Sequence, residues 1–245
     1  MIWIDCEFTS IFGYYLSYQI NFFALEEENM IPQELLRQKL KIMKSNPNSQ
    51  TISYYTDTWR KHLGSNPYFG IISNKFPGEI SRGDLFQLAA QAKQSNDLND
   101  IMILFISTMI WGYGTTGYGA WRTSEMLSSP NAEDIIKQTF ELIKSNNIIE
   151  AYNIQRLKRC GPPFFTKYFY FIGFGCNLLE YPLILDTKVY NALKDKIKIE
   201  ISQFVKASTW WYPEGYISYV QSMHNWAKSL EVEAHNIEYF LFSIG

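Results

Sequence analysis

Residues 152–193 read "YNIQRLKRCGPPFFTKYFYFIGFGCNLLEYPLILDTKVYNAL", and this stretch decides the fold. Its pattern predicts a helix, a tight turn at Gly161–Pro163, an aromatic helix, a loop and a short apolar run that ends at Asp186. A turn that joins two helices within a few residues leaves backbone N–H groups free to face an anion such as a phosphate. Asp186 comes directly before a helix that begins "TKVYNAL", where a carboxylate accepts hydrogen bonds from free amides.

The remainder of the chain is also mainly helical in pattern. Apolar residues recur at helical spacing in most segments, and residues 100–111 are apolar nearly all round, which indicates a buried central helix. Ser81 is a plausible cap for a helix that begins near Asp84. Further helices are expected at residues 31–45, 52–63, 128–145, 187–195, 216–230 and 236–243.

Two glycine-rich segments predict loops instead. Residues 64–84 are rich in Gly, Pro, Asn and Ser, which predicts a long ordered loop. Residues 112–121 read "GYGTTGYGAW", where glycines alternate with aromatic rings, and they predict a flexible loop that carries those rings. Residues 1–25 match neither period cleanly and could contain a strand.

The composition is that of a globular protein. Hydrophobic residues make up 47% of the 245 residues and charged residues 19%, which excludes a disordered chain. The formal net charge of −2 argues against a protein that coats nucleic acid without specificity, but it leaves room for a local positive face. Aromatic residues reach 17%, and such rings serve for packing or as platforms on which bases stack.

The sequence indicates no metal, no cofactor and no membrane span. The three cysteines are too scattered for a disulfide framework or an iron–sulfur cluster, and the three histidines show no paired zinc spacing. No apolar run approaches about 18 residues, and the N-terminus lacks the positive charge of a signal peptide. We therefore expect a reduced, soluble, cytoplasmic protein that acts as a monomer.

The stretch quoted above resembles the helix-hairpin-helix DNA glycosylases, and within them the 8-oxoguanine DNA glycosylase branch with its short bacterial relatives. In that branch a lysine follows the hairpin and the catalytic aspartate lies nineteen residues further on. Here Lys167 follows the turn, and Asp186 lies nineteen residues after it. The likeness covers about 40 residues well and extends more weakly to "FISTMIWGYGTTGYGAWRT" upstream and "YFLFS" downstream. The chain departs from the family at the hairpin, where "CGPPFF" replaces the usual "PGVG".

The resemblance implies a fold and an activity. The fold would be mainly α, a two-lobed helix-hairpin-helix glycosylase fold with the active site in the cleft between the lobes. The protein would extrude a modified base from double-stranded DNA in a bacterial cell and cleave its N-glycosidic bond without a cofactor. The base would be oxidised guanine or, in a role in defence against phages, a hypermodified pyrimidine. Strand cleavage by β-elimination can follow.

The chemistry of these residues supports a catalytic pair. A nucleophile must attack C1′ of the sugar, and a carboxylate can stabilise the positive charge that develops as the base departs. A lysine attacks only as the neutral amine, and the apolar sequence around Lys167, "FFTKYFYF", provides surroundings that disfavour its charged form. Taken alone, Lys167 would be an ordinary snorkelling lysine and Asp186 a plain helix cap.

Further residues are expected around this pair. Phe242 occupies the position where the family stacks a ring on the extruded base, and Phe171 lies one turn after Lys167 on the same helical face. For both, ordinary core packing is the alternative. Tyr118 and Trp121 could wedge into the duplex, with packing in a loop as the alternative. The expected DNA-binding residues, each with an exposed helix end or a packed loop as the alternative, are Gly161, Thr166, Lys188, Lys158, Arg122 and Tyr113.

We expect three regions along the chain. Residues 1–100 would form an N-terminal helical region, residues 101–200 the helix-hairpin-helix catalytic core, and residues 201–245 the helices that complete the base pocket. Two other functions stay open on the residues alone. The chain could be a non-catalytic DNA-binding module in which Lys167 contacts a phosphate, or a helical module that binds other proteins.

Overall fold

The computed structural model describes residues 31–201, 205–207 and 210–245. This part of the chain is mainly helical, which confirms the expected fold class, and its strands form two short antiparallel pairs. The expectation of a strand within residues 1–25 lies outside the described residues. The helices are α2 (Gln33–Arg37), α3 (Lys39–Met43), α4 (Thr56–Leu63), α5 (Pro67–Lys75), α6 (Arg82–Ser95), α7 (Leu98–Tyr113), α8 (Gly119–Leu127), α9 (Ala132–Lys144), α10 (Ile148–Asn153), α11 (Pro162–Gly175), α12 (Thr187–Asn191), α13 (Pro213–Leu230) and α14 (Ala234–Ile244).

Short elements connect these helices. A 3-10 turn, Pro47–Ser49, leads into β1 (Thr51–Ser53), which pairs antiparallel with β2 (Glu79–Ser81). Strands β3 (Val205–Ala207) and β4 (Trp210–Trp211) form the second pair. A π-helical segment, Ala192–Ile197, continues α12.

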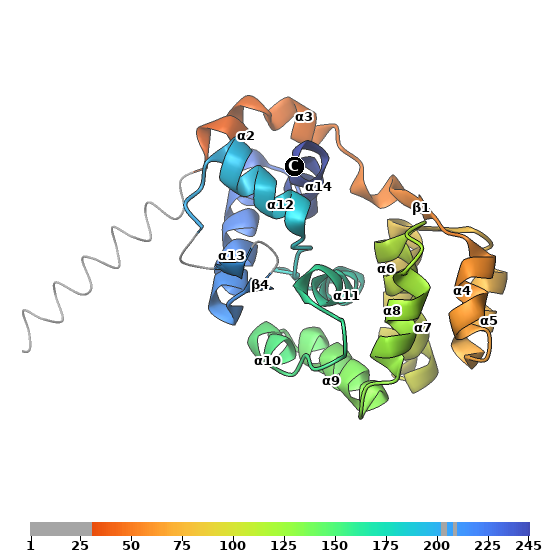
Figure 1. The fold of residues 1–245 in the computed structure, drawn as a ribbon. Coiled ribbons are helices and arrows are strands. Elements are labelled where there is room, and N and C mark those ends of the chain that lie inside the picture. The colour runs from red at the N-terminus through yellow and green to blue at the C-terminus, as the bar shows by residue number, and fades with distance from the viewer. Residues whose placement is uncertain (1–30, 202–204, 208–209) are drawn as a thin grey trace, which may run out of the picture.

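Helices α7 and α11 form the core. The apolar residues of α7 are buried almost without interruption from Ile101 to Trp111, as the all-round apolar pattern predicts. In Figure 1, α11 lies between the group of α6 to α8 and the group of α12 to α14. Helix α11 packs closely on α6 because Gly175 has no side chain: a Cβ there would lie 2.5 Å from the Cβ of Ala89. The two most apolar helices therefore form the frame on which the other helices pack.

The start of α6 follows its sequence signals. Ser81 caps the helix with its side chain, and the Asp84 carboxylate accepts a hydrogen bond from the backbone N–H of Ser81, which completes a capping box. The cap places Arg82 in the first turn of α6, where only 1% of this residue is exposed. The backbone N–H of Arg82 donates to the carbonyl of Gln50, so the chain before β1 lies beside the helix start.

A buried ion pair joins the first half of the described chain to its last helix. Arg82 Nη1 lies 2.9 Å from Glu238 Oε2 of α14, and the side chain of Glu238 is fully buried. The same guanidinium donates to the hydroxyl of Tyr170 in α11. Tyr170 in turn shares a hydrogen bond with Nδ1 of His235. This network ties α6, α11 and α14 together through polar groups that have no contact with bulk water.

Two loop expectations are wrong. Residues 64–84 are not a long loop, because α5 and β2 lie within them. Asn66 and Pro67 start α5: the Asn66 side chain accepts from the N–H groups of the first turn and Pro67 occupies an early helical position. The glycine-rich loop is shorter than residues 112–121, because α7 continues to Tyr113 and α8 begins at Gly119.

The hairpin turn is also placed differently. Gly161 is the N-cap of α11, and Pro162 and Pro163 are its first residues. Proline fits these positions because the N–H that it lacks would have no helical partner there. The connection between α10 and α11 therefore runs over residues 154–161, ahead of the expected turn. The helix expected at residues 31–45 is divided into α2 and α3 at Gln38.

No helix within the described part of the chain has both the length and the apolar character needed to cross a membrane. The three regions expected from the sequence, the two lobes and the cleft between them stay predictions.

The burial of His235 predicts that acid destabilises the protein. Burial first, and then the positive charge of Arg82, lower the pKa of His235 from 6.5 to about 3. Between these values the unfolded chain binds the proton and the native chain does not, so stability that is complete above pH 6.5 is lost as the pH falls towards 3. We expect the free energy of unfolding, measured by urea denaturation, to fall between pH 7 and pH 5 by up to about 1.4 kcal/mol per pH unit.

Two substitutions test the assignment of this slope. His235→Asn keeps a hydrogen-bonding group near Tyr170 but does not titrate, so it should flatten the slope. His62→Asn removes an exposed histidine of α4 and should leave it unchanged. A slope that persists in His235→Asn would contradict the assignment.

Candidate active site

A small cavity of about 100 Å³ brings together the two residues that the sequence analysis placed in a catalytic pair. Its walls come from segments that are far apart in the sequence: the chain around β1, the start of α6, the end of α7, α11, the segment before α12, and α14. The residues that line it are Gln50, Ile52, Arg82, Trp111, Gly112, Lys167, Ile184, Asp186, Glu238 and Phe242.

Lys167 enters this cavity from the second turn of α11. Its side chain is only 9% exposed, and its Nζ lies 3.6 Å from Asp186 Oδ2. The same Nζ donates a hydrogen bond of 2.6 Å to the carbonyl of Pro163, one turn earlier. The aliphatic part of the side chain passes close to Gly112, where a Cβ would lie 3.1 Å from Lys167 Cδ. The amine is therefore held at the cavity wall by one carbonyl and one carboxylate.

Asp186 uses its two oxygens for different purposes. Oδ1 accepts from the backbone N–H groups of Lys188 and Val189 and so caps α12, as the sequence predicts. Oδ2 faces the amine of Lys167. The cap therefore fixes the carboxylate with one oxygen directed at the amine.

Thr166 positions the segment that carries Asp186. The residue is fully buried, donates to the carbonyl of Pro162 and accepts from the N–H of Leu185. Tyr216 and Tyr219 of α13 donate to the carbonyls of Leu183 and Ile184. A direct DNA contact by Thr166, expected from the sequence, is not compatible with this burial, and its hydroxyl serves the packing of α11 against the Leu183–Leu185 segment instead.

The other residues expected to bind DNA fall into two groups. Lys158 and Lys188 are exposed, and the Lys188 amine lies 4.7 Å from the centre of the Phe242 ring. Arg122 is half-buried, with its guanidinium 4.6 Å from the ring of Tyr118. Gly161, as the N-cap, is half-buried at the start of α11.

Tyr113 differs from this group because it is only 5% exposed. Its ring stacks on Phe164 at a centroid distance of 4.0 Å, which places it in the support of the cavity wall. Tyr113 therefore has no exposed ring with which to make the expected DNA contact. Tyr118 and Trp121, in contrast, are 51% and 38% exposed.

Of the two rings expected in a base pocket, only one lines the cavity. Phe242 does so from α14. Phe171 is fully buried and meets the ring of Trp111 edge-on at 5.2 Å, so it lies behind the wall rather than in it. Trp111 takes the place at the wall because Phe171 lies one turn beyond Lys167, deeper in the core.

The sequence analysis missed the polar residues of the inner wall. Gln50, Arg82, Trp111 and Glu238 line the cavity, and none of them stands in a recognisable motif. One signal was available: Glu238 is a single acid within the apolar helix "NIEYFLF", a position where a buried charge needs a partner. Nothing in the sequence points to Arg82 as that partner.

The pKa values of Arg82 and Glu238 in this inner wall depend on burial and on the contact between the two groups. Burial raises the pKa of Glu238, and the guanidinium of Arg82 opposes that shift. Burial alone would lower the pKa of Arg82, but Glu238 and Tyr170 outweigh it and raise the pKa above its ordinary value. The guanidinium therefore stays protonated beside the Glu238 side chain, with which it forms the ion pair at 2.9 Å.

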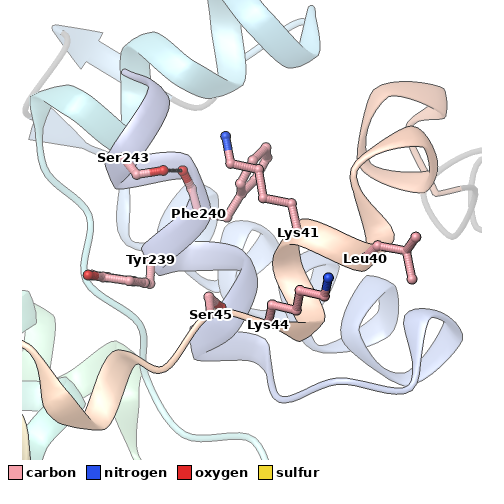
Figure 2. A pocket seen from close by; sticks show the side chains of 7 residues that line it. All are labelled: Leu40, Lys41, Lys44, Ser45, Tyr239, Phe240 and Ser243. Atoms are coloured by element: carbon pink, nitrogen blue, oxygen red, sulfur yellow. Dashed lines mark hydrogen bonds between the residues drawn. The ribbon is translucent and has the colours of Figure 1, made fainter.

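A larger hollow lies on another side of α14, between that helix and α3 (Figure 2). It measures about 560 Å³ and is open to solvent. Lys41 lies over the ring of Phe240, with the amine 5.4 Å from the ring centre. No carboxylate lines this hollow, and none of the residues expected in a catalytic site does so. The small cavity is therefore the better candidate.

Within the described residues, no cluster of three His, Cys, Asp or Glu side chains could hold a metal ion. Cys160 and Cys176 are buried and unpaired.

One of three comparisons with known proteins identifies a family. No curated protein and no solved structure matches the chain. A family model described as "Putative 8-oxoguanine DNA glycosylase OGG-like protein" matches residues 45–242. This range contains β1, the α10–α11 hairpin, Lys167, Asp186 and most of α14. The chain belongs to the family of OGG-like DNA glycosylases.

Proposed function

We propose that this protein excises a modified base from double-stranded DNA, with Lys167 as the nucleophile and Asp186 as the carboxylate that assists it. The observation that carries the proposal is the buried pair itself: Lys167 Nζ and Asp186 Oδ2 lie 3.6 Å apart at the wall of a cavity. Family membership supports DNA as the substrate.

The chemistry starts with a neutral amine. Lys167 gives up a proton before attack, and Asp186 is the carboxylate within reach to take part in that transfer. The amine then forms a bond to C1′ of the deoxyribose, while the bond between C1′ and the base nitrogen breaks. The bonding electrons leave with the base, which is then protonated. Asp186 also stabilises the positive charge that develops on the sugar as this bond lengthens.

A covalent intermediate follows from this step. Opening of the sugar ring converts the adduct into a Schiff base between Lys167 and C1′. Loss of a proton from C2′ then allows the 3′ phosphate to leave, which cuts the strand. Hydrolysis of the Schiff base releases the enzyme. Base excision and strand cleavage are separate outcomes and are measured separately.

The surface around the site offers groups for a duplex. Lys158 and Lys188 are exposed, and both supply positive charge near the start of α11 and α12. The exposed rings of Tyr118 and Trp121 are each paired with a guanidinium, and that of Arg159 lies 4.5 Å from Trp121. Flat rings backed by cations suit the gap that an extruded base leaves in the stack. We assign DNA contacts to these residues.

The identity of the excised base is the more detailed part of the proposal. The family description points to oxidised guanine. A hypermodified pyrimidine of a phage genome, which would place the protein in defence, is the alternative that a panel of modified duplexes tests.

Borohydride trapping tests the nucleophile. Borohydride reduces the Schiff base to a stable amine, so the native protein should form a covalent adduct with a duplex that carries its substrate base. Lys167→Gln should form none, because an amide cannot attack C1′. Asp186→Asn should lower the trapping rate by roughly 10²- to 10³-fold, the usual effect of losing one stabilising group in the transition state.

Asp186→Asn is a suitable variant because an asparagine side chain also caps helices. Asp186→Ala is its partner: it should lose the same activity and, in addition, about 1 kcal/mol of stability with the cap. DNA binding without any adduct, in a protein that folds normally, would support a non-catalytic DNA-binding module instead.

Gly112→Ala separates stability from activity. The new Cβ would lie 3.1 Å from Lys167 Cδ, so the lysine must move by a few tenths of an ångström. In the last turn of α7, alanine is also a better helix former than glycine, by up to about 1 kcal/mol. We expect slower trapping with unchanged or higher thermal stability.

Gly70→Ala provides the matched control. Gly70 also lies within a helix, α5, and a Cβ there meets nothing within 4 Å. It should gain stability without any change in trapping rate. Equal activity in Gly112→Ala and the native protein would show that the position of the amine is not critical.

A further inference from the structure

We propose that Gln50, Trp111 and Glu238, held in place by Arg82, select a base with a lactam edge, in which a ring N–H lies beside a carbonyl oxygen. This inference rests on the proposed function and names the class of base that the cavity accepts. It includes oxidised purines and uracil-type pyrimidines, and it excludes bases of the adenine and cytosine type.

Glu238 provides the acceptor. Its Oε2 accepts the short hydrogen bond of 2.9 Å from Arg82 Nη1, whereas Oε1 has only a contact of 3.5 Å with Nη2. Oε1 therefore has capacity for a further donor. The carboxylate lines the cavity and is fully buried, and Oε1 is the acceptor that we assign to a base in the cavity.

Gln50 provides a donor, and Arg82 fixes its orientation. Arg82 Nε can only donate, so the atom 2.7 Å from it must be the Gln50 oxygen. The amide NH2 of Gln50 then points away from the guanidinium, and it has no hydrogen-bond partner among the described residues. Because Gln50 lines the cavity, this NH2 is available to a ligand there.

Trp111 provides a second donor. Its indole Nε1 is buried and has no hydrogen-bond partner in the described structure, although buried donors are normally satisfied. Phe171 packs against the ring edge-on, and the guanidinium of Arg82 lies 5.3 Å from the ring centre. The ring is thus fixed at the cavity wall, and its unpaired N–H is the donor that we assign to a ligand there.

The wall therefore offers one anionic acceptor and two donors. A lactam matches this set, because its carbonyl oxygen accepts from Gln50 or Trp111 and its ring N–H donates to Glu238. The adenine and cytosine edges have a ring nitrogen lone pair in place of that N–H, and it would face the carboxylate. A buried acceptor that finds no donor in this way should lower kcat/KM for such a base roughly 10- to 100-fold.

A panel of duplexes tests the selection. Each duplex carries one altered base: 8-oxoguanine, uracil or 5-hydroxymethyluracil for the lactam edge, and N6-methyladenine or 5-methylcytosine for the opposite edge. We expect kcat/KM for base release to be at least about tenfold higher for some lactam base than for any amino base. Equal or higher activity on the amino bases would overturn the inference.

An abasic duplex separates this inference from the proposed function. It contains the sugar aldehyde but no base, so borohydride trapping on it depends on Lys167 and not on the inner wall. If the native protein forms no adduct with the abasic duplex, the proposed role of Lys167 as nucleophile is contradicted. Abasic trapping together with a preference for amino bases would contradict only the lactam selection.

Trp111→Phe tests the wall directly, because it removes the N–H and keeps an aromatic ring. It should lower kcat/KM on the preferred lactam base by roughly 10- to 100-fold, a larger loss than in abasic trapping, which involves no base. Trp226→Phe is the matched control, since Trp226 of α13 also has a buried Nε1 without a partner but does not line the cavity. Equal effects of the two substitutions would overturn the assignment.

Gln50→Glu gives a second, independent readout. The glutamate can still accept from Arg82 but replaces the NH2 donor by an acceptor, so the preference for carbonyl-bearing bases should fall. This variant leaves the Arg82–Glu238 pair in place, so it tests the wall without removing a partner from the buried ion pair. An unchanged base preference in Gln50→Glu would overturn the role of Gln50.

Discussion

The contact between Arg82 and Glu238 is the interaction on which the arrangement of this molecule depends. Two buried charges are tolerated only when they are paired, and removing one partner typically costs about 3–5 kcal/mol. The pair joins the first turn of α6 to α14, and Tyr170 brings α11 into the same network. Because the cavity lies where these three helices meet, the polar wall of the site and the packing of the fold rely on one set of hydrogen bonds.

The position of the proposed catalytic pair follows from the same frame. Lys167 belongs to α11. Asp186 follows the Leu183–Leu185 segment, whose backbone is hydrogen-bonded to the hydroxyl groups of Thr166, Tyr216 and Tyr219. The cap of α12 fixes one oxygen of Asp186 and leaves the other towards the amine. The distance between the two groups is therefore set by backbone geometry, which favours a site that is organised before substrate binds.

Local signals in the sequence predicted the parts of this structure that are local. The cap at Ser81, the buried helix α7 and the cap at Asp186 each depend on neighbours within a few residues, and the structure has all three. The sequence also placed Lys167 and Asp186 in one site, and they lie 3.6 Å apart, although their roles are proposals. The inner wall could not be predicted in this way, because Arg82 and Glu238 are 156 residues apart and only the tertiary fold brings them together.

The two prolines at the start of α11 explain why side chains must carry more of the DNA contact than the hairpin pattern suggests. Pro162 and Pro163 occupy the first positions of the helix, where other residues would offer free backbone N–H groups to a phosphate. With a net charge of −2, the protein also has no general attraction for DNA. In the proposed function, binding would rest on local cations such as Lys158 and Lys188. Occupation of the polar cavity would then be the interaction that only a correct base can supply.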